Sequence, residues 1–248
     1  MTRPVRAFIC DLDGCIAAVG HVAFDLARLD QLARRNRESS DDPSIPPLSF
    51  VTGRPHSYVD AIMQALDVGL AVSFENGAGL ATRHPYRAWL APGIEEGLAD
   101  VRRLERLVDD DPDMVLQPGK MASASVFPVE ASLDPGPLMA KLRRMLDEHD
   151  LDLVLDPSNE CVNVLIPGVD KTTGFEWLCT ELGLEPADVA GIGDSVGDIG
   201  WLRRCGVSFA PANAAADVRA SVTHALAGND VVATVAAYEA LVAANRAS

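Results

Sequence analysis

The stretch Ala7-Phe8-Ile9-Cys10-Asp11-Leu12-Asp13-Gly14 decides the fold of this chain. Its first four residues are apolar and predict a short buried strand. Two carboxylates, Asp11 and Asp13, end this strand, and a glycine follows them. Asp and Gly are common in ordinary turns, so a strand-terminating turn is one interpretation. In an open α/β sheet, however, ligands bind beyond the carboxyl ends of the strands, so the two acids are also candidates for a site.

The composition is that of an acidic chain with a large apolar fraction. It has 248 residues, of which 48% are hydrophobic, which is enough for one large domain or two modest ones. The net charge of -15 argues against nucleic acid or a membrane surface as partner, because both select basic proteins. Five scattered cysteines predict neither a disulfide framework nor a zinc site. Without a signal peptide or an apolar span in the sequence, we expect a cytoplasmic protein.

Two further strands are predicted to end in polar residues. An apolar run over 48–51 leads into Thr52-Gly53-Arg54-Pro55 and a helix over about 55–66, and a run over 189–193 leads into Asp194. Because the first amides of a helix are free to bind an anion, Thr52 and Gly53 are candidate contacts for one. Strands that alternate with helices on both sides of the chain predict an α/β fold with a doubly wound, mainly parallel sheet.

The middle of the chain has a different pattern. Residues 83–92 contain two prolines and are predicted to be irregular. Helices over about 94–108 and 137–148 follow, with strands near 114–117, 122–127, 151–155 and 161–166. We therefore expect a discontinuous core domain over 1–82 and 167–248, with an α+β domain inserted over 83–166.

The polar strand ends together indicate phosphoryl transfer. Carboxylates from two strand ends suit Mg²⁺, which prefers oxygen ligands and would offset their repulsion of a phosphate. One aspartate can then attack phosphorus, while its neighbour transfers protons. Lys171 is one of three lysines in a chain that otherwise uses arginine, which favours a specific need for its compact ammonium group.

These segments resemble the four motifs of the haloacid dehalogenase superfamily. The motifs are Asp11 to Gly14, Thr52 to Arg54, Lys171, and Gly193 to Asp198. The insertion between the second and third motifs resembles the α/β cap of a branch that includes archaeal-type phosphoglycolate phosphatases and sucrose phosphatase. Phe74 to Ala78 resembles a turn that precedes the cap in that branch, which adds Asn76 as a candidate substrate contact.

The resemblance implies a role for each acid. Asp11 would be the nucleophile, and Asp13 the general acid and base. Asp11, the backbone carbonyl of Asp13 and Asp194 would bind Mg²⁺. Asp198 would support the metal, either as a ligand or through water. Thr52 and Lys171 would bind the transferring phosphoryl group, and Lys171 would also orient Asp11.

The insertion supplies a second set of candidate substrate contacts. Lys120 precedes an alternating stretch in which Ser123 and Ser125 share one face of a strand. Asn163 lies in another predicted strand and projects opposite to its two valine neighbours. We expect these residues to form a polar roof over the motif residues. Arg54 of the core is a further candidate that either contacts the substrate or extends into solvent. The alternative is that this face of the insertion points to solvent.

We therefore predict a Mg²⁺-dependent phosphomonoester hydrolase that acts on a small phosphorylated metabolite through an aspartyl phosphate. A sugar phosphate or a phosphoglycolate-like molecule would suit the predicted roof. Two alternatives remain open on the sequence. One is a sugar phosphomutase of the same superfamily, and the other is a non-catalytic, receiver-like module that only accepts phosphate on Asp11.

Overall fold

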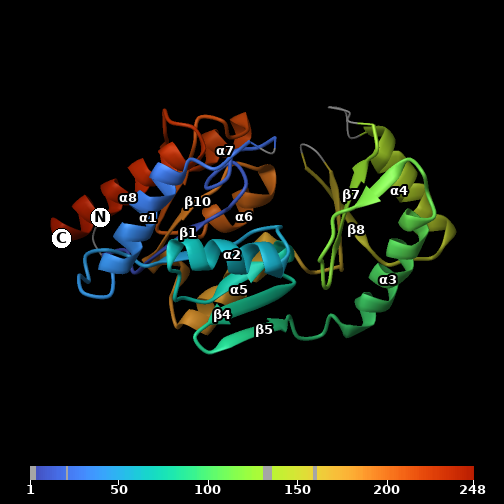
Figure 1. The fold of residues 1–248 in the computed structure, drawn as a ribbon, viewed down its shortest axis with the longest axis horizontal. Coiled ribbons are helices and arrows are strands. Elements are labelled where there is room, and N and C mark those ends of the chain that lie inside the picture. Colours follow the sequence, from blue (N-terminus) through green and yellow to red (C-terminus); the bar gives the residue numbers. More distant parts are fainter. Residues whose placement is uncertain (1–3, 21, 131–135, 159–160) are drawn as a thin grey trace.

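A five-stranded parallel sheet organises the larger part of the chain in the computed structural model (Figure 1). The structure describes residues 4–20, 22–130, 136–158 and 161–248. The strand order is β12-β11-β10-β1-β2, and every neighbouring pair is parallel. The strands are β1 (Ala7–Cys10), β2 (Leu48–Phe50), β10 (Val189–Ile192), β11 (Val207–Ala210) and β12 (His224–Ala225). The predicted α/β class with a doubly wound sheet is confirmed.

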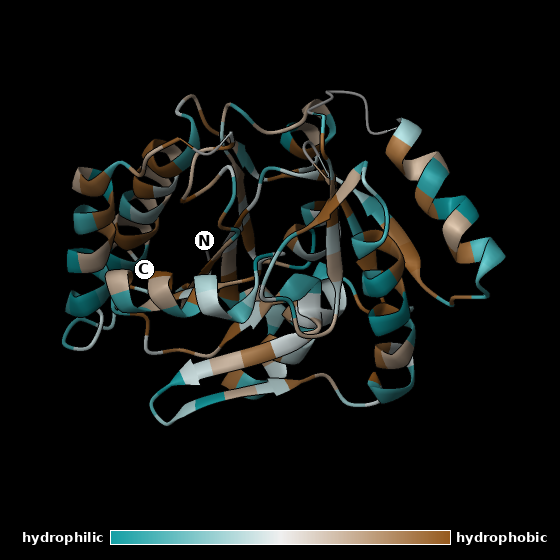
Figure 2. Ribbon diagram, turned by 45° about the vertical axis from the view of Figure 1, so that its right-hand side comes forward, coloured by the Kyte–Doolittle hydropathy of each residue, from teal (hydrophilic) through white to brown (hydrophobic). Residues whose placement is uncertain are grey.

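Helices cover both faces of this sheet because its strands are apolar on both faces. Phe8 and Cys10 of β1 pack into one apolar cluster with residues of α1, α2 and α8, whereas Ile9 packs into another with residues of α5, α6 and α7. Figure 2 shows the largely hydrophobic strands between helices that are striped hydrophobic and hydrophilic. The helices are α1 (Leu26–Glu38), α2 (His56–Leu66), α5 (Lys171–Leu182), α6 (Ile199–Leu202), α7 (Ala216–Ser221) and α8 (Asp230–Arg246).

A three-stranded antiparallel sheet extends the edge of the molecule beyond β2. It consists of β3 (Val72–Phe74), β4 (Gly79–Arg83) and β5 (Tyr86–Leu90), and a parallel bridge between Val51 and Ser73 joins it to the end of β2. The turn η1 (Glu75–Gly77) connects β3 to β4 in an antiparallel hairpin. The prediction of irregular structure over 83–92 was wrong. The prolines at 85 and 92 flank β5 instead of interrupting its pairing with β4.

A four-stranded antiparallel sheet and two helices form a second unit, here called the inserted unit (residues 95–165). The sheet has the order β6-β7-β9-β8. Its elements are α3 (Glu95–Asp109), β6 (Met114–Leu116), β7 (Ala124–Pro128), α4 (Gly136–Glu148), β8 (Val154–Pro157) and β9 (Val162–Leu165). Both helices cover one face of the sheet, and the other face is turned toward the parallel sheet (Figure 1).

Alternation along the strands gives the inserted unit its two different faces. Val126 of β7 and Val164 of β9 are fully buried in an apolar cluster with Leu104 of α3 and Leu142 of α4. Successive side chains of a strand point to opposite faces, so Ser125 and Asn163 lie on the face without helices. This is the face that looks toward the parallel sheet (Figure 1).

Candidate active site

Asp11 lies just beyond the carboxyl end of β1, between the ends of β10 and β2. Cys10 is in register with Ile192 on one side and with Phe50 on the other, so the motif segments that follow these strands meet at one sheet edge. The Asp11 side chain is almost fully buried. Its Oδ1 accepts a hydrogen bond from the Leu12 amide at 2.7 Å, and its Oδ2 faces the Lys171 ammonium at 2.7 Å.

Lys171 is held between two carboxylates. Asp170 caps α5 by accepting a hydrogen bond from the Thr173 amide, which makes Lys171 the first residue of the helix. Its Nζ lies 2.7 Å from Asp11 Oδ2 and 2.8 Å from Asp198 Oδ1. Both ion pairs are well buried, so they fix the ammonium beside the Asp11 carboxylate far better than a solvated pair would.

Asp198 is fully buried and has two hydrogen-bond donors on each oxygen. Lys171 Nζ and the indole N–H of Trp201 donate to Oδ1, and the amide and hydroxyl of Ser195 donate to Oδ2. Burial opposes its charge, but Lys171 and the hydrogen bonds together hold the pKa of Asp198 below its ordinary value. Its position is therefore that of a carboxylate that orients Lys171.

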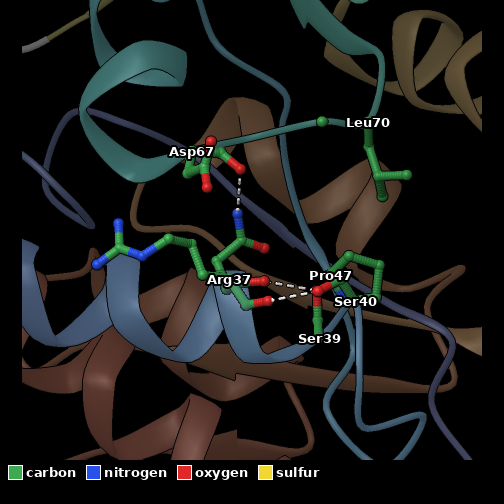
Figure 3. A pocket seen from close by; sticks show the side chains of 8 residues that line it. Arg37, Ser39, Ser40, Pro47, Asp67 and Leu70 are labelled. Atoms are coloured by element: carbon green, nitrogen blue, oxygen red, sulfur yellow. Dashed lines mark hydrogen bonds between the residues drawn. The ribbon is translucent and has the colours of Figure 1, made fainter.

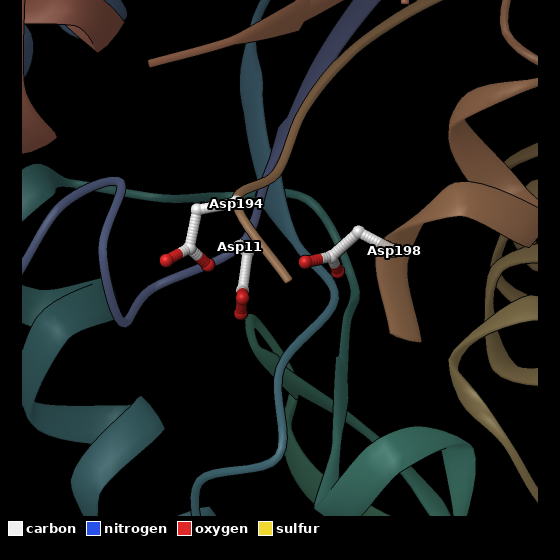
Figure 4. A group of neighbouring side chains, drawn as sticks. All are labelled: Asp11, Asp194 and Asp198. Atoms are coloured by element: carbon white, nitrogen blue, oxygen red, sulfur yellow. The ribbon is translucent and has the colours of Figure 1, made fainter. Parts of the chain in front are cut away.

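Asp194 completes a cluster of carboxylates with Asp11 and Asp198 (Figure 4). One oxygen of each residue lies within 4.8 Å of the others. Gly14 makes room for Asp194, because a Cβ at residue 14 would lie 2.1 Å from its Oδ2. Burial and the charge of Asp198 raise the pKa of Asp194 to about 7, and burial also raises that of Asp11. Burial and mutual repulsion disfavour the charged forms of these carboxylates. A cluster of oxygen ligands of this kind suits a hard divalent cation, which would neutralise them.

The Asp13 side chain turns away from this cluster toward Arg54. The guanidinium Nε and NH2 lie 2.7 and 2.5 Å from its two carboxylate oxygens, in a bidentate pair. The guanidinium also stacks over the Tyr58 ring at 4.7 Å. About a third of the Asp13 side chain remains exposed, which leaves its carboxylate accessible to a bound substrate.

The second motif forms a tight, buried loop. Thr52 is fully buried, and its Oγ1 accepts a hydrogen bond from the Arg54 amide at 3.2 Å. The Asn76 amide donates to the Thr52 carbonyl, so the η1 turn braces this loop from behind. The Asn76 side chain packs against Gly53, and its buried Nδ2 has no hydrogen-bond partner among the described residues. Thr52, Gly53 and Asn76 thus lie together, with one unused donor beside them.

The inserted unit brings Lys120 to the same loop. Lys120 is 8% exposed, and its Nζ donates to the Gly53 carbonyl at 2.7 Å. Ser123 is also buried, but its hydroxyl donates to Glu75 and not toward the Asp11 carboxylate. Asn163 accepts a hydrogen bond from Ser125 at 2.7 Å. Because Lys120, Ser123 and Ser125 are all buried on the face without helices, this face does not point to solvent.

Sequence reasoning missed three residues that hold the site and its contact with the inserted unit. Glu75 is fully buried and accepts hydrogen bonds from the Met121 and Ala122 amides and from Ser123. Trp201 holds Asp198, and Asp156 of β8 lies beside Asn163. Glu75 stands in the turn whose resemblance pointed to Asn76 and not to Glu75, and Asp156 follows an apolar strand. Neither residue has a local signal, since their partners come from distant parts of the chain.

A surface hollow elsewhere on the molecule has no catalytic group (Figure 3). It lies beside Pro47, at the start of β2 and thus at the opposite end of that strand from Thr52. Asn36 in its wall donates to the carbonyls of Leu66 and Asp67 and accepts from the Leu48 amide. Its polar groups are engaged in joining α1, α2 and β2, so its role is structural.

Comparisons with known proteins agree with this arrangement. The family model for haloacid dehalogenase-like hydrolases matches residues 129–238. A phosphoglycolate phosphatase of Natronomonas pharaonis is 31% identical over 170 residues, which cover 68% of this chain and 73% of the relative. The chain belongs to the haloacid dehalogenase-like hydrolases. The prediction of an enzyme, a phosphatase of this family, is confirmed.

More distant relatives of this hydrolase extend over most of its length. A phosphoglycolate phosphatase of Methanococcoides burtonii is 27% identical and aligns with 89% of each chain. The solved structure of a Thermoplasma acidophilum protein superposes with a TM-score of 0.75 at 16% identity, over 96% of this chain and 99% of that one. The sucrose-phosphatase of Synechocystis, solved with sucrose and phosphate, gives a TM-score of 0.67 at 17% identity, over 96% and 98% of the two chains.

Across the described residues of the hydrolase, every helix is too short or too polar to traverse a lipid bilayer.

Proposed function

We propose that this hydrolase cleaves small phosphate monoesters through a phosphorylated Asp11, with Mg²⁺ as its cofactor. The observation that carries the proposal is the buried Lys171 ammonium 2.7 Å from Asp11 Oδ2, in a cluster that also holds the Asp194 carboxylate. Lys171 holds one Asp11 oxygen in place and offsets the charge of an approaching phosphate. The named relatives from Methanococcoides and Natronomonas, both phosphoglycolate phosphatases, support an ester of this kind.

Asp11 and Asp194 are the residues that would hold Mg²⁺. When bound, the cation would neutralise carboxylates and phosphate oxygens that otherwise repel each other. Asp198 would not bind the cation directly, because its oxygens already accept hydrogen bonds from Lys171, Trp201 and Ser195. We therefore assign Asp198 to the orientation of Lys171.

The reaction divides into two displacements at phosphorus. An Asp11 oxygen attacks phosphorus, the bond to the ester oxygen breaks, and the leaving oxygen takes a proton from Asp13. Water then attacks the phosphorus of the aspartyl phosphate and gives a proton to Asp13. The bond from phosphorus to Asp11 breaks, which releases phosphate and restores both carboxyl groups. The Thr52 hydroxyl, the Gly53 amide and the free Asn76 Nδ2 would hold phosphate oxygens.

We further propose that the inserted unit is a cap that closes over this chemistry. Lys120 and Glu75 already link it to the second-motif loop and the η1 turn. The expected inserted domain over 83–166 remains the basis of this proposal, but its hinge would lie near the end of β5, since Ala88 packs on the core cluster and Leu90 packs on both clusters. The free thiols of Cys10, Cys15, Cys179 and Cys205 support a reducing, cytoplasmic location.

Turnover of p-nitrophenyl phosphate tests the proposal. We expect hydrolysis with Mg²⁺, loss of activity in EDTA, and its return when Mg²⁺ is restored. Asp11→Asn should lower kcat by at least ~10³-fold, because the amide is no nucleophile. Asp41→Asn in the exposed loop after α1 is the matched control and should retain full activity. Full activity in EDTA, or an active Asp11→Asn enzyme, would refute the corresponding assignment.

A further inference from the structure

The loop that follows β11 binds both of the chain segments that place Asp11 and Asp194. In this loop (residues 211–215), here called the β11 loop, the Ala215 amide donates to the Asp194 carbonyl at 3.0 Å. Its Asn213 side chain reaches the other segment, where Nδ2 donates to the Gly14 carbonyl at 2.9 Å. Gly14 belongs to the turn that begins at Asp11. The β11 loop therefore ties the turn after β1 to the segment after β10.

The Asn213 side chain is held at both ends of its amide group. The Asp230 amide, at the start of α8, donates to Asn213 Oδ1 at 2.8 Å, which turns Nδ2 toward Gly14. Arg219 of α7 donates to the Pro211 carbonyl at 2.7 Å, so the β11 loop is also fixed at its first residue. Asn213 is exposed, yet it spends its donor and its acceptor on main-chain groups of two distant segments. Its side chain is therefore a brace between them.

A second side chain, from α8, holds the same turn. Thr234 is fully buried, and its hydroxyl donates to the Cys15 carbonyl at 2.6 Å. The turn is closed within itself by the Gly14 amide, which donates to the Ala17 carbonyl at 2.7 Å. Two consecutive carbonyls of the turn, those of Gly14 and Cys15, are thus bound by side chains from the last part of the chain. The position of the turn depends on the β11 loop and α8 as well as on β1.

The position of this turn bears directly on the carboxylate cluster. A Cβ at residue 14 would lie 2.1 Å from Asp194 Oδ2 and 2.4 Å from its Cγ, so the Gly14 backbone packs against this carboxylate without a gap. A movement of the turn would therefore displace Asp194 relative to Asp11. Mg²⁺ demands near-ideal octahedral geometry, whereas Ca²⁺ accepts a variable one. The spacing of the two carboxylates consequently matters more for Mg²⁺ than for Ca²⁺.

We infer that Asn213 is a positioning residue of the cation site, which fixes the spacing of Asp11 and Asp194 by holding the Gly14 carbonyl. The inference rests on the proposed function, in which these two carboxylates hold Mg²⁺. Asn213 acts through the backbone of the turn and contacts neither carboxylate group. Its loss should weaken the binding of Mg²⁺, while Ca²⁺ binds nearly as before. A side chain that only stabilised the fold would affect both cations equally.

Calorimetric titration of the substrate-free enzyme with Mg²⁺ and with Ca²⁺ tests the inference without any turnover. Asn213→Ala should raise the Kd for Mg²⁺ at least ~10-fold, as the loss of groups that orient metal ligands commonly does, and the Kd for Ca²⁺ less than ~3-fold. The matched control is Asn229→Ala, at an exposed asparagine that makes no side-chain capping bond to α8, and it should change neither constant. Thr234→Val, which removes the bond to Cys15, should act in the same direction as Asn213→Ala.

The possible results separate the inference from the proposed function. A smaller rise in the Kd of Asn213→Ala for Mg²⁺, or an equal rise for both cations, would overturn the inference. The proposed function would still stand if the wild-type enzyme hydrolyses p-nitrophenyl phosphate with Mg²⁺. Asp194→Asn locates the cation, because it removes a proposed ligand. An unchanged Mg²⁺ Kd in that variant, or a wild-type enzyme that binds no Mg²⁺, would refute the cation site of the proposed function, and the inference with it.

Discussion

Replacing Glu75 with glutamine perturbs the contact that joins the inserted unit to the core. The Glu75 carboxylate is fully buried and accepts hydrogen bonds from the Met121 amide at 2.7 Å, the Ala122 amide at 2.9 Å and the Ser123 hydroxyl at 2.9 Å. All three donors belong to the inserted unit's side of the contact. A glutamine of the same shape has one oxygen to accept with, and its NH₂ group must face at least one backbone N–H.

The expected cost follows from these bonds. A hydrogen bond to a charged group contributes about 1.5–3 kcal/mol to stability, against about 1 kcal/mol for a neutral one, and a buried donor without a partner costs about 1–3 kcal/mol. In the Glu75→Gln variant, two hydrogen bonds lose their charged acceptor and one buried amide loses its acceptor. Together these losses give a destabilisation of about 2–5 kcal/mol. In a chain of this size, about 1 kcal/mol shifts Tm by roughly 2–4 °C, so Tm should fall by roughly 4–20 °C.

Differential scanning calorimetry checks this value, together with limited proteolysis of the segment around Met121. The control is Glu105→Gln, which removes a surface ion pair with Arg102 and should shift Tm by no more than about 2 °C. If the inserted unit loosens, the Glu75→Gln enzyme is cleaved faster near Met121 before it unfolds globally. A Tm within 1 °C of the control variant's would show that the three bonds do not hold the two units together.

Two further predictions concern Gly14, beside the carboxylate cluster, and Lys120 of the inserted unit. Gly14→Ala places a methyl group 2.1 Å from Asp194 Oδ2 at a backbone φ of +72°, so it should raise the Mg²⁺ concentration needed for half-maximal activity at least ~10-fold, whereas Gly69→Ala, which meets no atom within 4 Å, should not. Burial lowers the pKa of Lys120 from 10.5 to about 8, so the unfolded chain binds more protons between these values. The difference in free energy of unfolding between the wild type and Lys120→Met should therefore rise by about 3 kcal/mol from pH 8 to 10.5. Urea titrations at both pH values measure this difference. A difference that stays flat or falls would contradict the burial of a charged lysine.

The parallel sheet was predictable because its strands carry their signal locally. β1 and β10 are continuous runs without polar side chains, and β11 is apolar apart from Ser208. The segment Tyr86–Leu90 lacks that signal. Its residues are only partly buried on one side of an edge hairpin, so its strand conformation depends on pairing with β4. β12 was not predicted for the same reason. Its two residues, His224 and Ala225, are exposed and form a strand only through their pairing with β11.

The residues of the site were likewise predictable where the signal is local in the sequence. Asp11, Lys171, Asp194 and Asp198 follow strand ends or begin a helix, and the topology of parallel strands brings such positions together whatever the detailed packing. The hydrogen-bond partners of these residues are less predictable, even where they lie close in the sequence. Trp201 reaches Asp198 from the next helix, and its role depends on a packing arrangement that apolar spacing does not encode.

The contacts of the inserted unit were the least predictable part of the site. Alternation predicted that Ser123 and Asn163 lie on a polar face, but not which groups they would meet there. In the structure Ser123 is bound to Glu75, whereas Asn163 lies between Ser125 and Asp156. Both outcomes depend on how the inserted sheet is set against the core, which is a property of the whole fold.

The η1 turn bears on how this enzyme could be recombined with its relatives. The Glu75 and Asn76 amides donate to the Arg54 and Thr52 carbonyls, while the Glu75 carboxylate binds the backbone of residues 121–122. One turn therefore links the second-motif loop to the insertion. On the side of the insertion, two of the donors to Glu75 are main-chain amides. A chimaera that exchanges residues 91–166 would tolerate many side-chain differences at this seam, provided that the donor insertion offers two amides in the same place.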